Sequence, residues 1–229
     1  MCTGPATGAL CPQCRAARAT FGGGLADLVV PLAYAKSRMS PTHQSEHHVY
    51  GYKRLPAAPK CERDLRLMVR VGGLLHGACI ASSVGAWDVV TFVPSAKRPG
   101  PEHPSAGLAR QIADLNPAAR RVRLSIGPGF DMEPSRSPRL DRFTLEPEFR
   151  PAVRGRHALI VDDTWVSGDK AQSASLALKT FGAEQVTVLC VARWLRHNWE
   201  DHRRLIEDLR DPYDALCCPV TGSACPASG

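Results

Sequence analysis

The feature of this sequence that most constrains its fold is the strand–helix–strand pattern of residues 157–192. The runs "HALIVDD" (157–163) and "EQVTVLCVA" (184–192) have the β-branched, apolar character of buried strands, and "DKAQSASLALKTFGA" (169–183) has helical spacing. Two strands joined by a helix require a parallel, right-handed crossover. We therefore predict an α/β protein with a parallel sheet flanked by helices, followed by a charged helix at 193–210.

Further segments with strand or helical periodicity precede this unit. Apolar residues recur at helical spacing in residues 61–84 and 104–115, whereas 87–94 is a β-branched and aromatic run closed by proline. We expect another strand at 120–126. Residues 127–155 then form a long polar segment rich in proline and arginine, and a loop of that length in a compact domain is usually functional or mobile.

The two ends of the chain carry cysteines and small residues rather than periodic apolar segments. A chain of 229 residues is long enough for one core with an appendage. We predict a loop-like, cysteine-containing leader at 1–30, a main domain at 31–210 and a turn-rich, cysteine-rich tail at 211–229. Residues 32–60 are expected to hold a short helix and a proline-rich linker, in which the histidine-bearing stretch 42–53 is an exposed linker.

The composition indicates an anionic partner. The formal charge is +7 and the pI is near 9.1, so the protein attracts phosphates, nucleotides or nucleic acid over long range. Aromatic residues make up only 6% and no block of lysine and arginine stands out, which makes a dedicated nucleic-acid surface the weaker interpretation. The sequence shows no secretory signal and no apolar run long enough to cross a bilayer, so we expect a cytoplasmic protein without a membrane partner.

Two adjacent carboxylates, Asp162 and Asp163, follow the apolar run of the first predicted strand. Ligands of open α/β sheets bind beyond the carboxyl ends of the strands, and the turn 164–168 leads into a helix N-terminus, where backbone N–H groups favour an anion. Two carboxylates suit a polyol or a metal, and the turn suits a phosphate. The alternative is structural, with one carboxylate solvated and the other capping the turn.

The stretch "ALIVDDTWVSG" resembles the phosphoribosyl-pyrophosphate (PRPP) signature of the type I phosphoribosyltransferases, which have a parallel sheet flanked by helices. The resemblance implies that Asp162 and Asp163 hold the ribose 2′- and 3′-hydroxyls and act as the catalytic pair. It also implies a 5′-phosphate loop, which comprises Thr164, Trp165, Val166, Ser167, Gly168, Asp169, Lys170, Ala171 and Gln172. Family members commonly have Gly-Thr after the glycine of the motif, where this chain has Asp169 and Lys170. Asp169 would repel a phosphate, Lys170 could offset it, and Ser173 could supply a replacement hydroxyl.

Other segments resemble the ComF-type, amidophosphoribosyltransferase-like members of that family. "WDVVTFVPSAKRPGPEHPSAGLARQIA" is similar to their strand, pyrophosphate loop and following helix, which makes Lys97 and Arg98 the candidate pyrophosphate ligands; the alternative is that both are solvated loop charges. The resemblance also implies Mg²⁺ bound with PRPP. Arg136, Arg139 and Arg142 could belong to a loop that closes over the site, although each of them also suits a surface position.

The cysteines offer a second candidate site. Cys11 and Cys14 form a CxxC pair that resembles the zinc-binding leader of the ComF group, and with Cys218 and Cys225 of the tail they could complete a structural Zn²⁺ site. Cys217 competes with Cys218 as a ligand, and free thiols in the chain ends are the alternative. Cys61, Cys79 and Cys190 lie in apolar segments and are expected to be buried as small hydrophobic residues.

Together these features predict an enzyme that transfers the phosphoribosyl group of PRPP to an unidentified base or amine and releases pyrophosphate. A homodimer is one option for its assembly. The alternative function is a non-catalytic, competence-type accessory protein that senses PRPP or a nucleotide and contacts DNA or protein through a zinc module. A zinc-binding nucleic-acid module that does not need Asp162 or Asp163 is a third interpretation.

Overall fold

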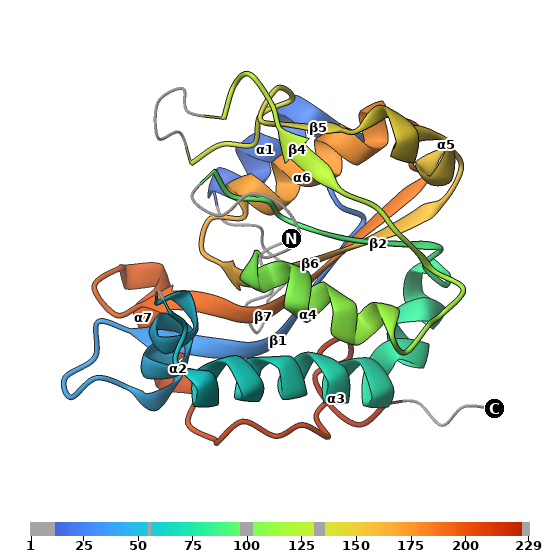
Figure 1. Cartoon of the computed structure of the whole chain (residues 1–229). Helices are drawn as coiled ribbons and strands as arrows, with labels where there is room; N and C mark the ends of the chain where they lie inside the picture. The colour runs from blue at the N-terminus through green and yellow to red at the C-terminus, as the bar shows by residue number, and fades with distance from the viewer. Residues whose placement is uncertain (1–11, 55, 97–102, 131–135, 226–229) are drawn as a thin grey trace.

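A five-stranded, entirely parallel sheet forms the centre of the molecule, as predicted (Figure 1). This computed structural model describes residues 12–54, 56–96, 103–130 and 136–225. The strand order is β1-β7-β6-β2-β3. The strands are β1 (Leu28–Ser37), β2 (Val89–Phe92), β3 (Arg120–Arg121), β6 (His157–Trp165) and β7 (Gln185–Arg196).

Helices cover both faces of this sheet. Helices α2, α3 and α4 share one apolar core with it, whereas α6 and a small antiparallel hairpin, β4–β5, share the other (Figure 1). The helices are α1 (Pro12–Phe21), α2 (Gln44–Lys53), α3 (Pro59–Val84), α4 (Pro104–Ala113), α5 (Arg150–Val153), α6 (Asp169–Thr180) and α7 (Glu200–Asp208). The hairpin strands are β4 (Leu124–Ile126) and β5 (Phe143–Leu145), and 3₁₀ turns occupy Gly22–Gly24 and Pro147–Phe149.

The alternation of side chains along β6 explains why two cores form. Ala158 and Ile160 point into the core under α6, whereas Leu159 and Val161 point into the core under α3 and α4. A central strand of a parallel sheet is buried on both faces, so its sequence is continuously apolar. The run that ends at the two aspartates therefore has the composition that its position requires.

The long helix α3 lies along the lower face of the sheet in Figure 1. By length and composition alone, α3 is long and apolar enough to cross a membrane, which was not expected from the sequence. Core helices of soluble proteins also meet this criterion, so it is weak evidence for a membrane segment. One stripe of α3, including Leu65, Val69 and Ile80, is buried against the sheet and α4. The predicted helix 61–84 is thus confirmed, and Gly72 and Gly73 do not interrupt it.

The early part of the chain differs from the expectation. The leader is helical at α1, and Leu25 and Ala26 belong to buried cores. Residues 28–37 form the edge strand β1 rather than a helix or linker, and the predicted linker 42–53 contains helix α2. Helix α2 has no clear apolar stripe, which is why its sequence did not indicate a helix, but its buried Glu46, Val49 and Tyr52 lie three residues apart and so share one face.

Two later segments are also corrected. The polar segment 127–155 holds β5 and α5, and β5 pairs with β4. Strand β7 continues to Arg196, so the charged helix α7 begins at Glu200 rather than near 193. The part of the tail that the structure describes, 211–225, is built of turns, as predicted.

Candidate functional site

Asp162 lies near the carboxyl end of β6, with its side chain almost fully buried. Its Oδ1 accepts a hydrogen bond of 2.9 Å from the backbone N–H of Asp163. Burial, and then the negative charge of Asp163, raise the pKa of Asp162 to about 7. Near neutral pH this carboxyl group can therefore either donate a hydrogen bond to a hydroxyl group or accept one from it.

Asp163 points to the other face of the strand and contacts a residue that the sequence did not single out. Its Oδ1 lies 3.0 Å from Nζ of Lys53, the last residue of α2. The Lys53 ammonium is also one of the charges that lower the pKa of Asp162. The helical spacing of Val49 and Tyr52 was the available signal that Lys53 belongs to a helix packed on the sheet.

Buried hydroxyl groups accompany the carboxylate pair. The Tyr52 and Ser105 hydroxyls interact with each other, without a hydrogen bond of normal geometry, and Oγ1 of Thr164 has no hydrogen-bonding partner within the part of the chain described. Burial, and then the charge of Asp163, raise the pKa of Tyr52, while Ser105 lowers it. A buried hydroxyl without a partner is costly, so the position of Thr164 beside the carboxylate pair favours a polar ligand there.

The turn after β6 is built around Gly168. This glycine has φ of +77°, and a Cβ atom on it would lie 2.1 Å from the indole ring of Trp165. Trp165 itself is buried in the core under α6 and therefore does not face a ligand. The turn directs the N-terminus of α6, with its exposed N–H groups and positive dipole end, toward the carboxyl edge of the sheet.

The carboxylate of Asp169 stands at this helix N-terminus and is neutralised from a distant part of the chain. Its Oδ2 lies 2.5 Å from NH1 of Arg142, and its Oδ1 accepts a hydrogen bond from the Ser167 hydroxyl. The Arg142 side chain is only 5% exposed, so the surface position considered for it is wrong. The Lys170 ammonium lies over the ring of Phe130, so among the described residues the ion pair of Asp169 is with Arg142.

Residues 169–172 of the predicted phosphate loop belong to α6. Ala171 is buried, and the Gln172 side chain accepts a hydrogen bond from the backbone N–H of Ala26. The side chains of Ala171 and Gln172 are therefore engaged in the core and are not available to a phosphate. The backbone N–H groups of this turn remain candidate phosphate ligands. Ser173 donates to the carbonyl of Asp169 and accepts from the backbone N–H of Arg139. The predicted pyrophosphate ligands Lys97 and Arg98 lie outside the described residues.

The tail cysteines meet residues of α3. Sγ of Cys225 lies 3.1 Å from Nδ1 of His76, and Sγ of Cys218 lies 3.4 Å from Sγ of Cys79. The predicted partner Cys14 lies on α1, beside α6 on the opposite face of the sheet, and Cys11 is outside the described residues (Figure 1). Cys217 is exposed, so Cys218 is the buried member of that pair. Cys61 and Cys190 are buried, as predicted.

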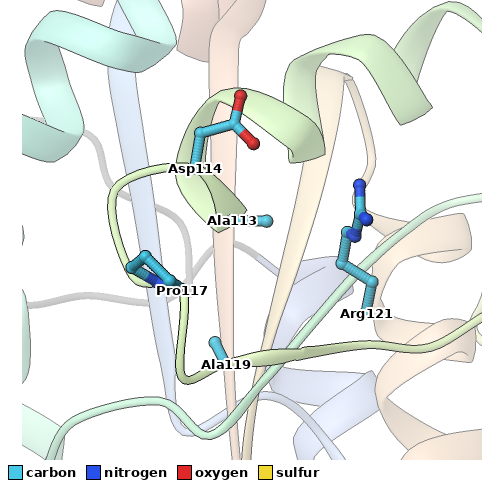
Figure 2. A pocket seen from close by; sticks show the side chains of 5 residues that line it. All are labelled: Ala113, Asp114, Pro117, Ala119 and Arg121. Carbon is cyan, nitrogen blue, oxygen red and sulfur yellow. The ribbon is translucent and has the colours of Figure 1, made fainter.

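A hollow of about 350 Å³ lies beside strand β3, away from the carboxyl ends of the strands (Figure 2). Ala113, Asp114, Pro117, Ala119 and Arg121 line it. Because β3 pairs with the beginning of β2, this hollow is near the amino ends of the strands. It is thus separate from the carboxylate pair, and ligands of parallel sheets bind at the carboxyl ends.

No protein-family model matches the sequence, and no curated protein matches it. Solved structures that match include the allosteric regulatory enzyme of purine biosynthesis, which is 22% identical with a TM-score of 0.36; the match covers 55% of this chain and 25% of that chain. Hypoxanthine phosphoribosyltransferase from Trypanosoma cruzi, complexed with the product IMP, is 17% identical over 58% of this chain and 73% of its own, with a TM-score of 0.40. A purine phosphoribosyltransferase from Pyrococcus horikoshii is 14% identical over 54% and 70%, with a TM-score of 0.34. At these values the similarity extends no further than the arrangement of strands and helices.

Proposed function

We propose that this protein binds PRPP and transfers its phosphoribosyl group to a nitrogenous acceptor, with release of pyrophosphate. The observation that carries the proposal is the position of Asp162 and Asp163 at the carboxyl edge of a parallel sheet, directly before the N-terminus of α6. A ribose 5-phosphate needs hydroxyl-binding groups and an anion site a few ångströms apart. The carboxylate pair and the turn 164–168 supply these two kinds of group in that order.

In this proposal the two carboxyl groups bind the ribose 2′- and 3′-hydroxyls. The backbone N–H groups of the turn and of the first residues of α6 bind the 5′-phosphate, and the Ser167 hydroxyl, which donates to Asp169 in the structure, would rotate to donate to the phosphate instead. Asp162 contributes a carboxyl group whose pKa of about 7 lets it exchange hydrogen bonds with a hydroxyl. Lys53 limits the repulsion between Asp163 and an anionic substrate.

The reaction breaks the bond between ribose C1 and a pyrophosphate oxygen and forms a bond from C1 to the acceptor nitrogen, which then loses a proton. Positive charge develops on the ribose in between, and the nearby carboxylates stabilise it electrostatically. No covalent protein nucleophile is needed. The partly exposed Asp163 carboxylate is the type of hard oxygen ligand that suits Mg²⁺. Bound Mg²⁺ would supply charge neutralisation of the departing pyrophosphate.

A second candidate function is PRPP or nucleotide sensing without turnover. Asp169 favours it, because this carboxylate stands at the helix N-terminus where the proposal needs a phosphate. A protein that binds the ligand weakly and releases it unchanged tolerates such a group better than an enzyme does. Pyrophosphate release in the presence of bases and amines distinguishes the enzyme from the sensor.

Calorimetric titration of PRPP with Mg²⁺ tests the binding step. We expect saturable binding to the wild type and loss of binding in Asp162→Asn/Asp163→Asn, with Asp114→Asn at the opposite edge of the sheet as the control. Circular dichroism establishes that each variant is folded. Equal binding by the double variant, or no binding by the wild type, overturns the proposal. If binding holds, a panel of bases and amines is then screened for pyrophosphate release.

A further inference from the structure

Four metal-ligating side chains converge between α3 and the tail. His76 and Cys79 are three residues apart on α3, so they lie on the same face of the helix. The ligand atoms of His76, Cys218 and Cys225 all lie within 4.8 Å of one another, and Cys79 is 3.4 Å from Cys218. Cys79 is also within hydrogen-bonding reach of Cys225. Three of these ligand atoms are therefore mutually close, and the Cys79 sulfur lies beside the two tail sulfurs as a fourth candidate ligand.

The orientation of the His76 ring suits a ligand. Its Nε2 lies 2.8 Å from the carbonyl oxygen of Ala215, which can only accept a hydrogen bond. Nε2 therefore carries the proton in the neutral ring, and Nδ1, which faces Cys225, carries the lone pair. A backbone carbonyl that fixes the tautomer in this way is the usual outer partner of a histidine bound to a metal.

The tail has almost no apolar anchor of its own. Among the described residues 211–225, Cys218 is the fully buried hydrophobic residue and Val220 packs partly buried against the core that includes α3, whereas Tyr213 and Leu216 are 50% and 70% exposed. A tight turn holds Cys218 in place: its N–H donates to the carbonyl of Ser223, and its own carbonyl accepts from Gly222, which has φ of +74°. Apolar contact between the tail and the segment of chain it follows, α3, is thus limited to the side chains of Cys218 and Val220 among the described residues (Figure 1).

We propose that His76, Cys79, Cys218 and Cys225 bind one zinc ion, which fastens the tail to α3. Three thiolates and one imidazole form a closed tetrahedral set, which is typical of structural zinc and unsuited to Mg²⁺ or Ca²⁺. The ligand set combines the two predicted tail cysteines with two residues of α3 and does not include Cys11 or Cys14. The ion replaces the apolar contacts that the tail lacks.

Metal analysis of the full chain, purified under reducing conditions, tests this proposal without reference to catalysis. We expect about one zinc per chain in the wild type. Cys217→Ser, which changes the exposed neighbour, and Cys14→Ser, which changes the alternative pair, are expected to retain it. Cys225→Ser and His76→Gln are expected to lose most of it. Zinc that is lost in Cys14→Ser and retained in His76→Gln contradicts the assignment.

Two further measurements use only the wild-type protein, so they test the proposal even if the variants fail to fold. Replacement of zinc by Co²⁺ in the wild type is expected to give the visible absorption of tetrahedral cobalt and the ultraviolet band of thiolate-to-cobalt charge transfer. Chelation is expected to speed proteolytic cleavage within 211–225 by at least about tenfold, because the tail is then released. An absence of cobalt binding, or a Cys79–Cys218 disulfide in the freshly purified protein, overturns the proposal.

Discussion

The Arg142 guanidinium lies 2.5 Å from the carboxylate of Asp169, although the two residues are 27 positions apart in the sequence. This pair joins the segment before β5 to the N-terminus of α6. It places a negative side chain and its compensating cation where the proposed function requires a phosphate. The charge balance between these two residues should therefore determine how strongly the turn 164–168 attracts an anion.

Asp169→Asn removes the negative charge at the α6 N-terminus and retains an oxygen for the hydrogen bond from Ser167. The Arg142 charge is then no longer neutralised by a carboxylate, so we expect PRPP to bind on the order of tenfold more tightly, about 1.4 kcal/mol. Arg142→Met leaves Asp169 without its cation and should weaken binding by a similar factor. It should also lower the free energy of unfolding by about 1–3 kcal/mol.

Titration calorimetry and urea unfolding measure these two effects. Arg139→Met is the matched control, because Arg139 pairs with the more exposed Asp141 and should change stability by less than about 1 kcal/mol. Unchanged PRPP affinity in Asp169→Asn would show that the phosphate does not approach this helix end.

Asp162 should make stability depend on pH. Its folded-state pKa of about 7 lies above the value of about 3.9 for an unfolded aspartate, so the folded protein keeps a proton that the unfolded chain releases between these values. The contribution of Asp162 to stability is therefore full below about pH 4 and falls as the pH rises to about 7. Asp162→Asn, which does not titrate, should gain about 2–4 kcal/mol relative to the wild type between pH 4 and pH 8. Urea unfolding across that range measures the difference, and a constant difference contradicts the prediction.

Gly168→Ala should destabilise the protein more than an ordinary substitution at a positive φ. A Cβ atom at Gly168 would meet the Trp165 ring at 2.1 Å, whereas one at Gly155, with φ of +67°, meets nothing within 4 Å. Gly155→Ala therefore measures the backbone strain alone, about 1 kcal/mol. We expect Gly168→Ala to cost about 1–3 kcal/mol more than this control in thermal unfolding. Equal losses would mean that the turn relaxes away from Trp165.

Lys53→Met should weaken PRPP binding by about three- to tenfold, because the Asp163 carboxylate would then repel the phosphates without compensation. Lys60→Met on α3 removes the same charge from a side chain that forms no ion pair with Asp163 and serves as the control. Calorimetry at low and high salt should show that the difference between the two variants shrinks as salt screens the charges. Identical affinities for the two variants at low salt would exclude a role for Lys53.

The sheet and the carboxylate pair could be predicted because their signals are local. The apolar run before Asp162 and the helical spacing after Gly168 each fall within one element. Strand β1 was missed because Pro31 and Lys36 interrupt its apolar pattern. An edge strand accepts a proline, since one side of it needs no partner, and among the described strands β1 pairs with β7 alone.

The missed contacts join residues that are far apart in the sequence. Lys53 and Asp163 come from α2 and β6, and no local pattern indicates that they meet. Cys79 fits the apolar face of α3 and is therefore predicted to be a buried hydrophobic residue, and no pattern in the sequence singles out His76 beside it. Tertiary structure therefore decides which cysteines share a site.

The pairing of β1 with β7 affects how the protein folds during its synthesis. Leu28 aligns with Thr187 and Ser37 with Arg196, so the first strand pairs with the last one. During synthesis, β1 leaves the ribosome long before its partner exists, and it must wait as an unpaired apolar segment. Contacts of such long sequence separation slow folding, and the waiting strand is exposed to aggregation. Chaperone dependence and low yield at high expression temperature should therefore accompany this topology.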